Sequence, residues 1–266
     1  GYLLPKTVDS KTLVIAISIS GNTKETLSIL DYSSNSDAKF IAISSGGEMV
    51  KKCKDHSISH YNISMNHSPR ASFGIFLYSI LNMLDEALPI QKGEVAESLE
   101  KMKNMQEKIN SKNLGNDNSA LNLAKKINSN PLIYFPDGLK AAAIRFKNSL
   151  QENSKMHVIN EDLIEACHNG IVAWEQSSTS KPIFIRGKND HPQTKRRWDI
   201  LKEYFNDRNI SYREVVSEED SIFSKLINLI YILDYTSIYK AILLKIDPTP
   251  VKSIDFVKER YDFKHI

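Results

Sequence analysis

Three hydroxyl side chains surround a glycine and an asparagine in the stretch SISGNT, near the start of the chain. Ser18, Ser20 and Thr23 can each donate a hydrogen bond, and Gly21 lets the backbone approach a ligand closely. A phosphate has three oxygens to satisfy and suits this pattern better than a carboxylate does. The alternative is an ordinary helix N-cap, because serine and threonine are preferred there and a threonine follows three residues after Thr23, near a capping-box arrangement.

A carboxylate and an imidazole in the second half of the chain could transfer protons next to a carbonyl group. Glu152 lies at the end of a predicted helix, and His168 follows sixteen residues later in a short helical or loop segment. One group could remove a proton while the other handles a hydroxyl. From the spacing alone, a surface glutamate and a capping or core histidine are the commoner explanation.

Arg70, in the segment SPRAS, could clamp a phosphate or stabilise an enediolate, although arginines in loops are more often solvated. His56, His60 and His67 are the candidates for a metal site. No cluster of carboxylates or thiolates accompanies these histidines in the sequence, so we expect no metal.

Elements of an α/β fold must position the hydroxyl-rich stretch. Residues 13–17 form a continuous apolar run, typical of a parallel strand that is covered on both faces. Residues 24–30 then read as the helix that packs back on the sheet. Residues 18–23 therefore lie where open α/β sheets bind ligands, and the free N–H groups and dipole of the helix favour an anion there.

The alternation of strand and helix continues along the chain and predicts two successive α/β domains, residues 1–115 and 116–266. A polar segment from about residue 90 to 130 is the expected connection. The other predicted strands lie at residues 40–44, 57–63 and 132–135, within 181–190, and at 211–217. Residues 222–246 are too long and too apolar for a surface helix, which predicts a buried helix or helix pair at a subunit or domain interface.

Composition restricts the class of protein. Of 266 residues, 41% are hydrophobic and 25% are charged, which is typical of a soluble globular protein. No apolar run reaches the length of a membrane span and no signal pattern is present, so we expect a cytoplasmic protein that binds no membrane. The net charge is +3 and the basic residues are scattered, so nucleic acid is not an expected partner. Cys53 and Cys167 do not make a disulfide framework.

The stretch SISGNTKET resembles the Ser-x-Ser-Gly-x-Thr-x-Glu-Thr signature of the sugar isomerase (SIS) domain superfamily. The segments SSGG, PRASFG, QENSK, CHNGIVAWE and DPTPVKSIDFVK then resemble, in order and spacing, the bifunctional phosphoglucose/phosphomannose isomerases of archaea and some bacteria. The resemblance implies two flavodoxin-like domains of the SIS type, each a three-layer α/β/α arrangement around a parallel sheet. That family begins with a strand and a loop, and no residues before Tyr2 could form them in this sequence. We therefore expect the first domain to be truncated at its N-terminus.

The resemblance also implies an activity: an aldose–ketose isomerase that converts glucose 6-phosphate, and mannose 6-phosphate, to fructose 6-phosphate through a cis-enediolate, without metal or cofactor. It implies a homodimer with shared active sites, because the family's histidine comes from the neighbouring subunit. The residue roles that it implies are phosphate binding by Ser18, Ser20 and Thr23, charge stabilisation by Arg70, proton transfer by Glu152, ring opening by His168, and sugar contacts by Thr249 and Lys258 in the C-terminal tail.

Two other functions stay open at this point. A non-catalytic SIS protein that only binds a sugar phosphate is disfavoured because both Glu152 and His168 are present. The isomerase domain of a glucosamine-6-phosphate synthase is disfavoured because the sequence shows neither a glutaminase domain nor a suitable lysine tail.

Overall fold

The computed structural model describes residues 1–127, 130–218 and 220–261. The chain divides into two compact units, residues 1–89 and 90–266. The polar segment expected to connect the domains contains the helix α4 (Lys92–Ile109), which packs against α9 (Ile222–Leu243) of the second unit. This division lies upstream of the predicted domain boundary at 115/116, because α4 belongs with the helices that follow it.

The first unit is built on a three-stranded parallel sheet in the order β1-β2-β3. Each strand runs into a helical segment, which is the expected alternation. The strands are β1 (Leu13–Ile17), β2 (Lys39–Ser44) and β3 (Ser59–Asn62), and the helical segments are α1 (Lys24–Leu30), η1 (Asp31–Asn35), α2 (Glu48–Asp55), η2 (Arg70–Ser72) and α3 (Phe73–Met83).

Helices cover both faces of this sheet. On one face, Leu30 of α1 and Met49 of α2 pack against Ala42 of β2, and all three side chains are fully buried. On the other face, Phe76 of α3 packs against Ile43. The alternation of Ala42 and Ile43 along β2 sends neighbouring side chains to opposite layers, as the pleat of a strand requires.

Strand β1 differs from the sequence prediction in its burial. Ala16 is buried, but Leu13 and Ile17 keep 43% and 42% of their surface exposed. The cause is that β1 lies at an edge of the sheet, where its only strand partner among the described residues is β2. The strand has the predicted bounds and its middle is covered on both faces, since Ala16 packs with Leu30 and Ile15 packs with Phe76. Only its two ends are more exposed than the sequence predicted.

The second unit contains a four-stranded parallel sheet in the order β5-β4-β6-β7. Its strands are β4 (Pro131–Phe135), β5 (Ile159–Asp162), β6 (Lys181–Arg186) and β7 (Arg213–Val216). Besides α4 and α9, its helical segments are α5 (Ser119–Lys126), η3 (Asp137–Leu139), α6 (Lys140–Ser154), α7 (Leu163–Ala166), η4 (Gly170–Glu175), α8 (Pro192–Asp207) and α10 (Lys252–Arg260).

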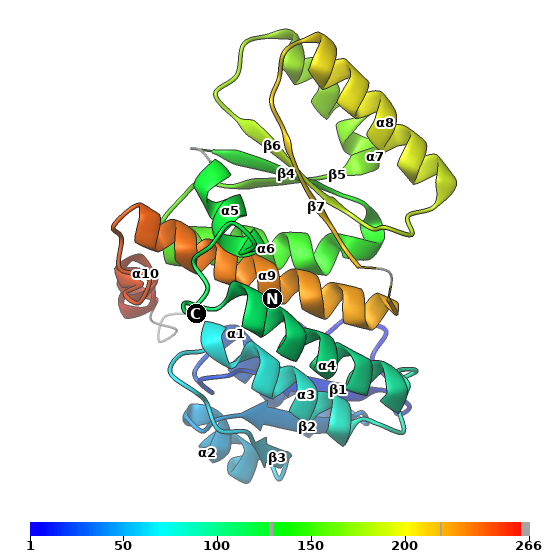
Figure 1. Cartoon of the computed structure of the whole chain (residues 1–266). Helices are drawn as coiled ribbons and strands as arrows, with labels where there is room; N and C mark the ends of the chain where they lie inside the picture. Colours follow the sequence, from blue (N-terminus) through cyan, green and yellow to red (C-terminus); the bar gives the residue numbers. More distant parts are fainter. Residues whose placement is uncertain (128–129, 219, 262–266) are drawn as a thin grey trace. The chain divides into compact units, whose positions relative to one another are not determined.

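An aromatic cluster fills one face of the second sheet. Tyr134 and Phe184 project from β4 and β6 toward Trp198 and Phe205 of α8, and all four are buried. The indole Nε1 of Trp174 donates to the Tyr134 hydroxyl at 2.9 Å, so this polar pair is satisfied inside the cluster. Helices α7 and α8 cover this face, and α6 and α9 lie on the opposite side of the sheet (Figure 1).

Helix α9 is a single helix rather than a helix pair. It is long and apolar enough to cross a membrane by length and composition, which corrects the view that no segment reaches that length. It packs against α4, α5 and α6, with Leu233 and Ala241 fully buried. The Lys240 ammonium within it donates to the Ile127 carbonyl at 2.6 Å. The apolar composition of α9 thus serves the core of the second unit.

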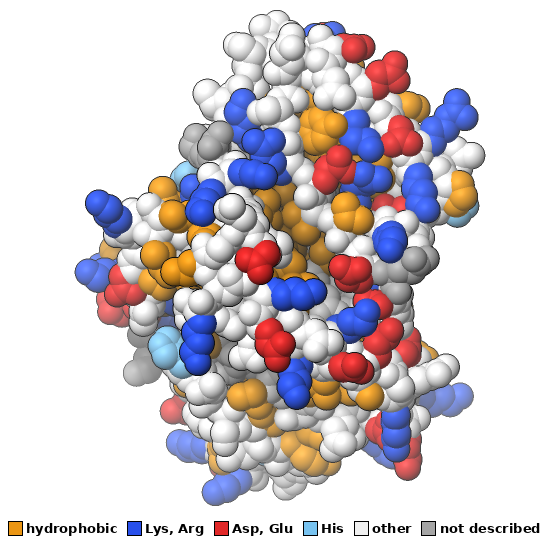
Figure 2. Space-filling model, in the orientation of Figure 1, with side chains coloured by type: hydrophobic (Ala, Val, Ile, Leu, Met, Phe, Trp, Pro, Cys, Tyr) orange, Lys and Arg blue, Asp and Glu red, His pale blue; other side chains and the backbone are white. Residues whose placement is uncertain are grey.

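Charged side chains of both signs are interspersed on the face of the molecule shown in Figure 2. Lysine and arginine side chains alternate with aspartate and glutamate there. This is the arrangement expected from nearly balanced totals of 35 basic and 32 acidic residues.

Candidate active site

The hydroxyl-rich stretch forms the loop between β1 and α1 in the first unit. Its central contact joins the side chains of Ser18 and Thr23, whose hydroxyl oxygens lie 2.8 Å apart. The Ser20 hydroxyl accepts from the Asn22 amide at 3.4 Å. Thr23 is the N-cap residue of α1, but its side chain forms no capping hydrogen bond among the described residues. The ordinary N-cap that the sequence left open is therefore not formed, and the hydroxyls face one another instead.

A second loop, SSGG at residues 44–47, packs against the first. The Ser45 amide and hydroxyl both donate to the Ile19 carbonyl, at 2.9 and 2.7 Å. The Asn22 side-chain oxygen accepts from the Glu48 amide at 2.9 Å. A Cβ atom on Gly21 would lie 1.8 Å from the Gly46 carbonyl oxygen, so only glycine fits this crossing. The two loops hold each other in one conformation.

Arg70 is the first residue of η2, which follows β3 in the same unit. Its side chain is half-buried. The preceding loop is held by Ser72, whose buried hydroxyl accepts from the Asn66 amide at 2.9 Å. This contact fixes the backbone on which Arg70 is carried.

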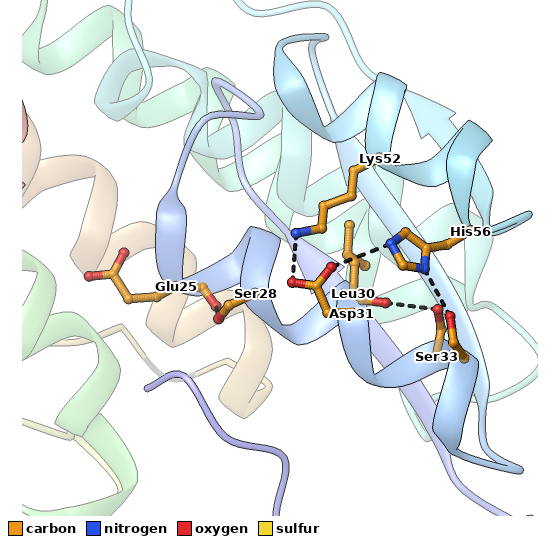
Figure 3. A network of polar contacts seen from close by, with 8 residues as sticks. Glu25, Ser28, Leu30, Asp31, Ser33, Lys52 and His56 are labelled. Atoms are coloured by element: carbon orange, nitrogen blue, oxygen red, sulfur yellow. Dashed lines mark hydrogen bonds and ion pairs between the residues drawn. The ribbon is translucent and has the colours of Figure 1, made fainter. Parts of the chain in front are cut away.

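Two of the three histidines considered as metal ligands, His56 and His60, have other side-chain contacts. His56, at the end of α2, lies 3.3 Å from an Asp31 carboxylate oxygen (Figure 3). Its Nδ1 lies 3.1 Å from the Ser34 hydroxyl. Lys52 binds the other oxygen of Asp31 at 2.7 Å, so the network ties α2 to η1 (Figure 3). His60 Nε2 lies 2.8 Å from the Ser44 hydroxyl. Within the described ranges, no three metal-binding side chains come together.

Glu152 lies in the last turn of α6 and is half-buried. The two residues that follow it are buried and bind α9. Asn153 donates to the Ser237 hydroxyl at 2.8 Å, and the Ser154 hydroxyl donates to the Ser237 carbonyl, also at 2.8 Å. Because the two residues after Glu152 are hydrogen-bonded to a core helix, the backbone of Glu152 is held in place.

Two polar residues of α6, one and two turns before Glu152, also bind α9. Arg145 of α6 donates to Asp234 of α9 through Nε at 3.0 Å and Nη2 at 2.6 Å. The Ser149 hydroxyl donates to the other Asp234 oxygen at 2.7 Å. Burial raises the pKa of Asp234, and the Arg145 guanidinium opposes that shift. Arg145, Ser149 and Asn153 are spaced four residues apart, so they form one polar stripe along the helix.

Lys155 joins the end of α6 to the C-terminal tail. It caps the helix in the left-handed conformation, with φ of 55°. Its ammonium donates to the Pro250 carbonyl at 2.7 Å and also to the Glu152 carbonyl. The structure thus brings Thr249, the residue before Pro250, to the end of the helix that carries Glu152. Lys258 lies further along the tail, exposed on α10.

His168 lies in the turn between α7 and η4, in agreement with the short helical or loop segment that the sequence predicted, and its side chain is exposed. Its amide donates to the Glu165 carbonyl at 3.0 Å. Helix α7 covers the aromatic face of the second sheet, and α6 with Glu152 covers the other face. The two proton-transfer candidates therefore belong to elements on opposite sides of one sheet.

Sequence reasoning missed the polar stripe on α6 and the Lys155 contact with the tail. The stripe had a visible signal, since polar residues recur every fourth position on a helix that is otherwise apolar on its inner face. The Lys155 contact had none, because Pro250 lies ninety-five residues further along the chain.

Comparisons with known proteins agree with this architecture. The structure superposes on the crystal structure of a glucose-6-phosphate isomerase like protein from Thermus thermophilus with a TM-score of 0.64 and 12% identity, over 97% of this chain and 89% of that one. The family model described as the bacterial phospho-glucose isomerase C-terminal SIS domain matches residues 116–261. The fold is therefore that of the SIS-type α/β proteins.

Two relatives cover almost the whole chain. The bifunctional phosphoglucose/phosphomannose isomerase of Caldicellulosiruptor bescii is 32% identical over 97% of this chain and 79% of its own length. The enzyme of the same name from Aquifex aeolicus is 29% identical over 97% of this chain and 78% of its own length. The chain belongs to the bifunctional phosphoglucose/phosphomannose isomerase family, as its motifs indicated.

Proposed function

We propose that the protein interconverts glucose 6-phosphate and mannose 6-phosphate with fructose 6-phosphate. The observation that carries the proposal is that the helix turn bearing Glu152 is held in place. Glu152 is half-buried in the last turn of α6. The next two residues bind α9, and Lys155 at the end of the helix binds the C-terminal tail. A general base must be held in this way to meet one particular proton.

The chemistry follows from where the proton moves. In the open-chain aldose, Glu152 removes the proton from C2, and the electrons of that bond form the double bond of a cis-enediolate. Return of the proton to C1, together with transfer of the O2 hydroxyl proton to O1, forms the C2 carbonyl and yields the ketose. Glucose and mannose 6-phosphates differ only in configuration at C2, so both give the same enediolate and one base serves both.

Other side chains would bind the substrate and stabilise the developing charge. Ser18, Ser20 and Thr23 would donate to the phosphate, because all three lie in the loop between β1 and α1, where the Ser18 and Thr23 hydroxyls contact each other. The Arg70 guanidinium would offset the negative charge of the enediolate. Thr249 would contact the sugar from the tail that Lys155 holds.

The Glu152→Gln variant tests the role of the base. Glutamine keeps the shape and hydrogen bonding but removes basicity, so kcat should fall by about a hundredfold or more while sugar phosphate binding changes little. Turnover is followed by coupling the glucose 6-phosphate formed to its dehydrogenase. Glu107→Gln, an exposed carboxylate on α4, is the matched control and should leave kcat unchanged. Near-normal turnover of Glu152→Gln would remove this residue from the mechanism.

We also propose a homodimer in which His168 opens the sugar ring in the active site of the other subunit. The placement of His168 and Glu152 on opposite sides of one sheet supports this. Co-expression of Glu152→Gln and His168→Ala subunits should then restore part of the activity, because one of the two sites in a mixed dimer keeps both residues. Mixed dimers as inactive as their parents would contradict the shared site.

A further inference from the structure

A pocket of about 450 Å³ lies in the second unit, at the carboxyl ends of the strands of its sheet. The loop assigned above to the substrate phosphate belongs to the first unit. The loops after β4, β5 and β6 line it. The chain leaves β4 toward β5 on one side and returns to β6 on the other, so the pocket lies where the strand order reverses. Open α/β sheets bind ligands at such a point, and the volume is that of a small-molecule site.

The loops around the pocket are fixed before any ligand binds. One carboxylate oxygen of Asp190 accepts from the Gly187 amide at 3.1 Å and from the Trp198 indole at 3.0 Å. A Cβ atom on Gly187 would lie 2.3 Å from the other oxygen, so the loop closes tightly on this side chain. Asp162 accepts from the Ile164 amide at 2.8 Å. A rigid wall lowers the entropy cost of binding.

The polar groups that line the pocket are of two complementary kinds. Arg197 of α8 and Lys225 of α9 can only donate hydrogen bonds and carry positive charge. Within the ranges that the structure describes, neither side chain forms an ion pair. Asp137 and Asp162 can only accept. A ligand that satisfies both kinds carries both an anionic group and hydroxyl donors.

We propose that this pocket is a second ligand site, and that it binds a polyhydroxylated phosphate monoester through Arg197 and Lys225. The two cations that line the pocket match the charge of a phosphate dianion, and Asp137 and Asp162 can accept from the hydroxyls of the ester. The site is distinct from the residues proposed for the isomerase reaction, because none of the side chains that line it is assigned to phosphate binding, proton transfer or sugar contact.

Trp198 makes this site measurable, since its indole is bound to the Asp190 carboxylate that lines the pocket. The probe is sorbitol 6-phosphate, which has no carbonyl group and cannot be isomerised; sorbitol is the unphosphorylated comparison. Titration of the full chain should give a saturable change in tryptophan fluorescence with sorbitol 6-phosphate and none with sorbitol.

The assignment to the pocket is tested with variants. Arg197→Ala and Lys225→Ala should each weaken the fluorescence titration at least about tenfold, because each removes one charged donor. Arg196→Ala, an exposed neighbour that does not line the pocket, is the matched control and should not change it. The Ser20→Ala, Thr23→Ala double variant, which disables the substrate phosphate loop, should also leave it unchanged.

Three results would overturn the proposal. One is the absence of a saturable change below about 10 mM probe. A second is equal binding of the probe by parent, Arg197→Ala and Lys225→Ala proteins, with far-UV spectra showing that all are folded. The third is loss of the signal in the Ser20→Ala, Thr23→Ala protein alone, which would assign the titration to the substrate loop. None of these results bears on the role of Glu152.

Discussion

Replacement of Gly21 by alanine should disrupt the crossing of the two loops that form the candidate phosphate site. Gly21 has a φ of 71°, in the left-handed region, and its position allows no Cβ atom. An added Cβ would lie 1.8 Å from the Gly46 carbonyl oxygen and 3.2 Å from the Ser44 hydroxyl. Backbone on one side and a strand end on the other leave no flexible group that could move aside.

The cost has two sources. A residue with a Cβ atom in the left-handed region costs about 1–2 kcal/mol. Relief of the overlap requires a shift of the SSGG loop, and overpacking of this kind costs about 1–3 kcal/mol. The free energy of unfolding should therefore fall by about 2–5 kcal/mol. Affinity for a sugar phosphate should fall as well, because the shift separates Ser20 and Thr23.

Urea unfolding followed by far-UV circular dichroism measures the effect. Gly74→Ala is the matched control, since a Cβ atom there meets nothing within 4 Å and Gly74 lies in α3. Alanine is the better helix former, so this control should be neutral or stabilising by up to about 1 kcal/mol. An unchanged unfolding free energy for Gly21→Ala, within about 0.5 kcal/mol, would refute the steric reasoning.

Three further outcomes are expected. Asp234→Ala leaves Arg145 without its carboxylate between α6 and α9 and should lower the unfolding free energy by about 2–4 kcal/mol in urea titrations, whereas a loss below about 0.5 kcal/mol would contradict the pair's structural role. Lys155→Met keeps the length of the side chain but loses the bond to the tail, so limited trypsin digestion should cleave the tail faster than in the parent; an unchanged rate would show that the bond does not hold it. Burial lowers the pKa of His60 beside Ser44, so the unfolded chain binds more protons and the free energy of unfolding should fall as the pH drops below about 6.5. His60→Gln should flatten this pH dependence of the urea midpoint. An identical slope in the variant would exclude His60 as the source of the dependence.

Local patterns in the sequence determined the elements around the hydroxyl loop. The apolar run at Leu13–Ile17 and the helix formers at Lys24–Leu30 have the bounds that the structure shows. The reason is that burial periodicity and the break at Gly21 are properties of neighbouring residues. The same holds for His168, whose turn is bounded by Gly170 in both sequence and structure.

Tertiary structure alone decided which elements are edges and which are core. Strand β5 (Ile159–Asp162) has the sequence INED, with one apolar residue, and pairing with β4 is what makes it a strand. Strand β1 has the sequence of a buried strand but lies at an edge. Pairing between distant segments determines both the formation of β5 and the edge position of β1, and the local sequence pattern does not specify this pairing.

The support for the candidate base was also decided by tertiary structure. The motif QENSK identifies Glu152, but its attachment depends on Ser237 and Pro250, which lie more than eighty residues away along the chain. Hydrogen bonds at that separation exist only after the helices have packed, because packing removes water and aligns donor with acceptor. The sequence determined which side chains could react, and the packing of α6 against α9 decided where the carboxylate is held.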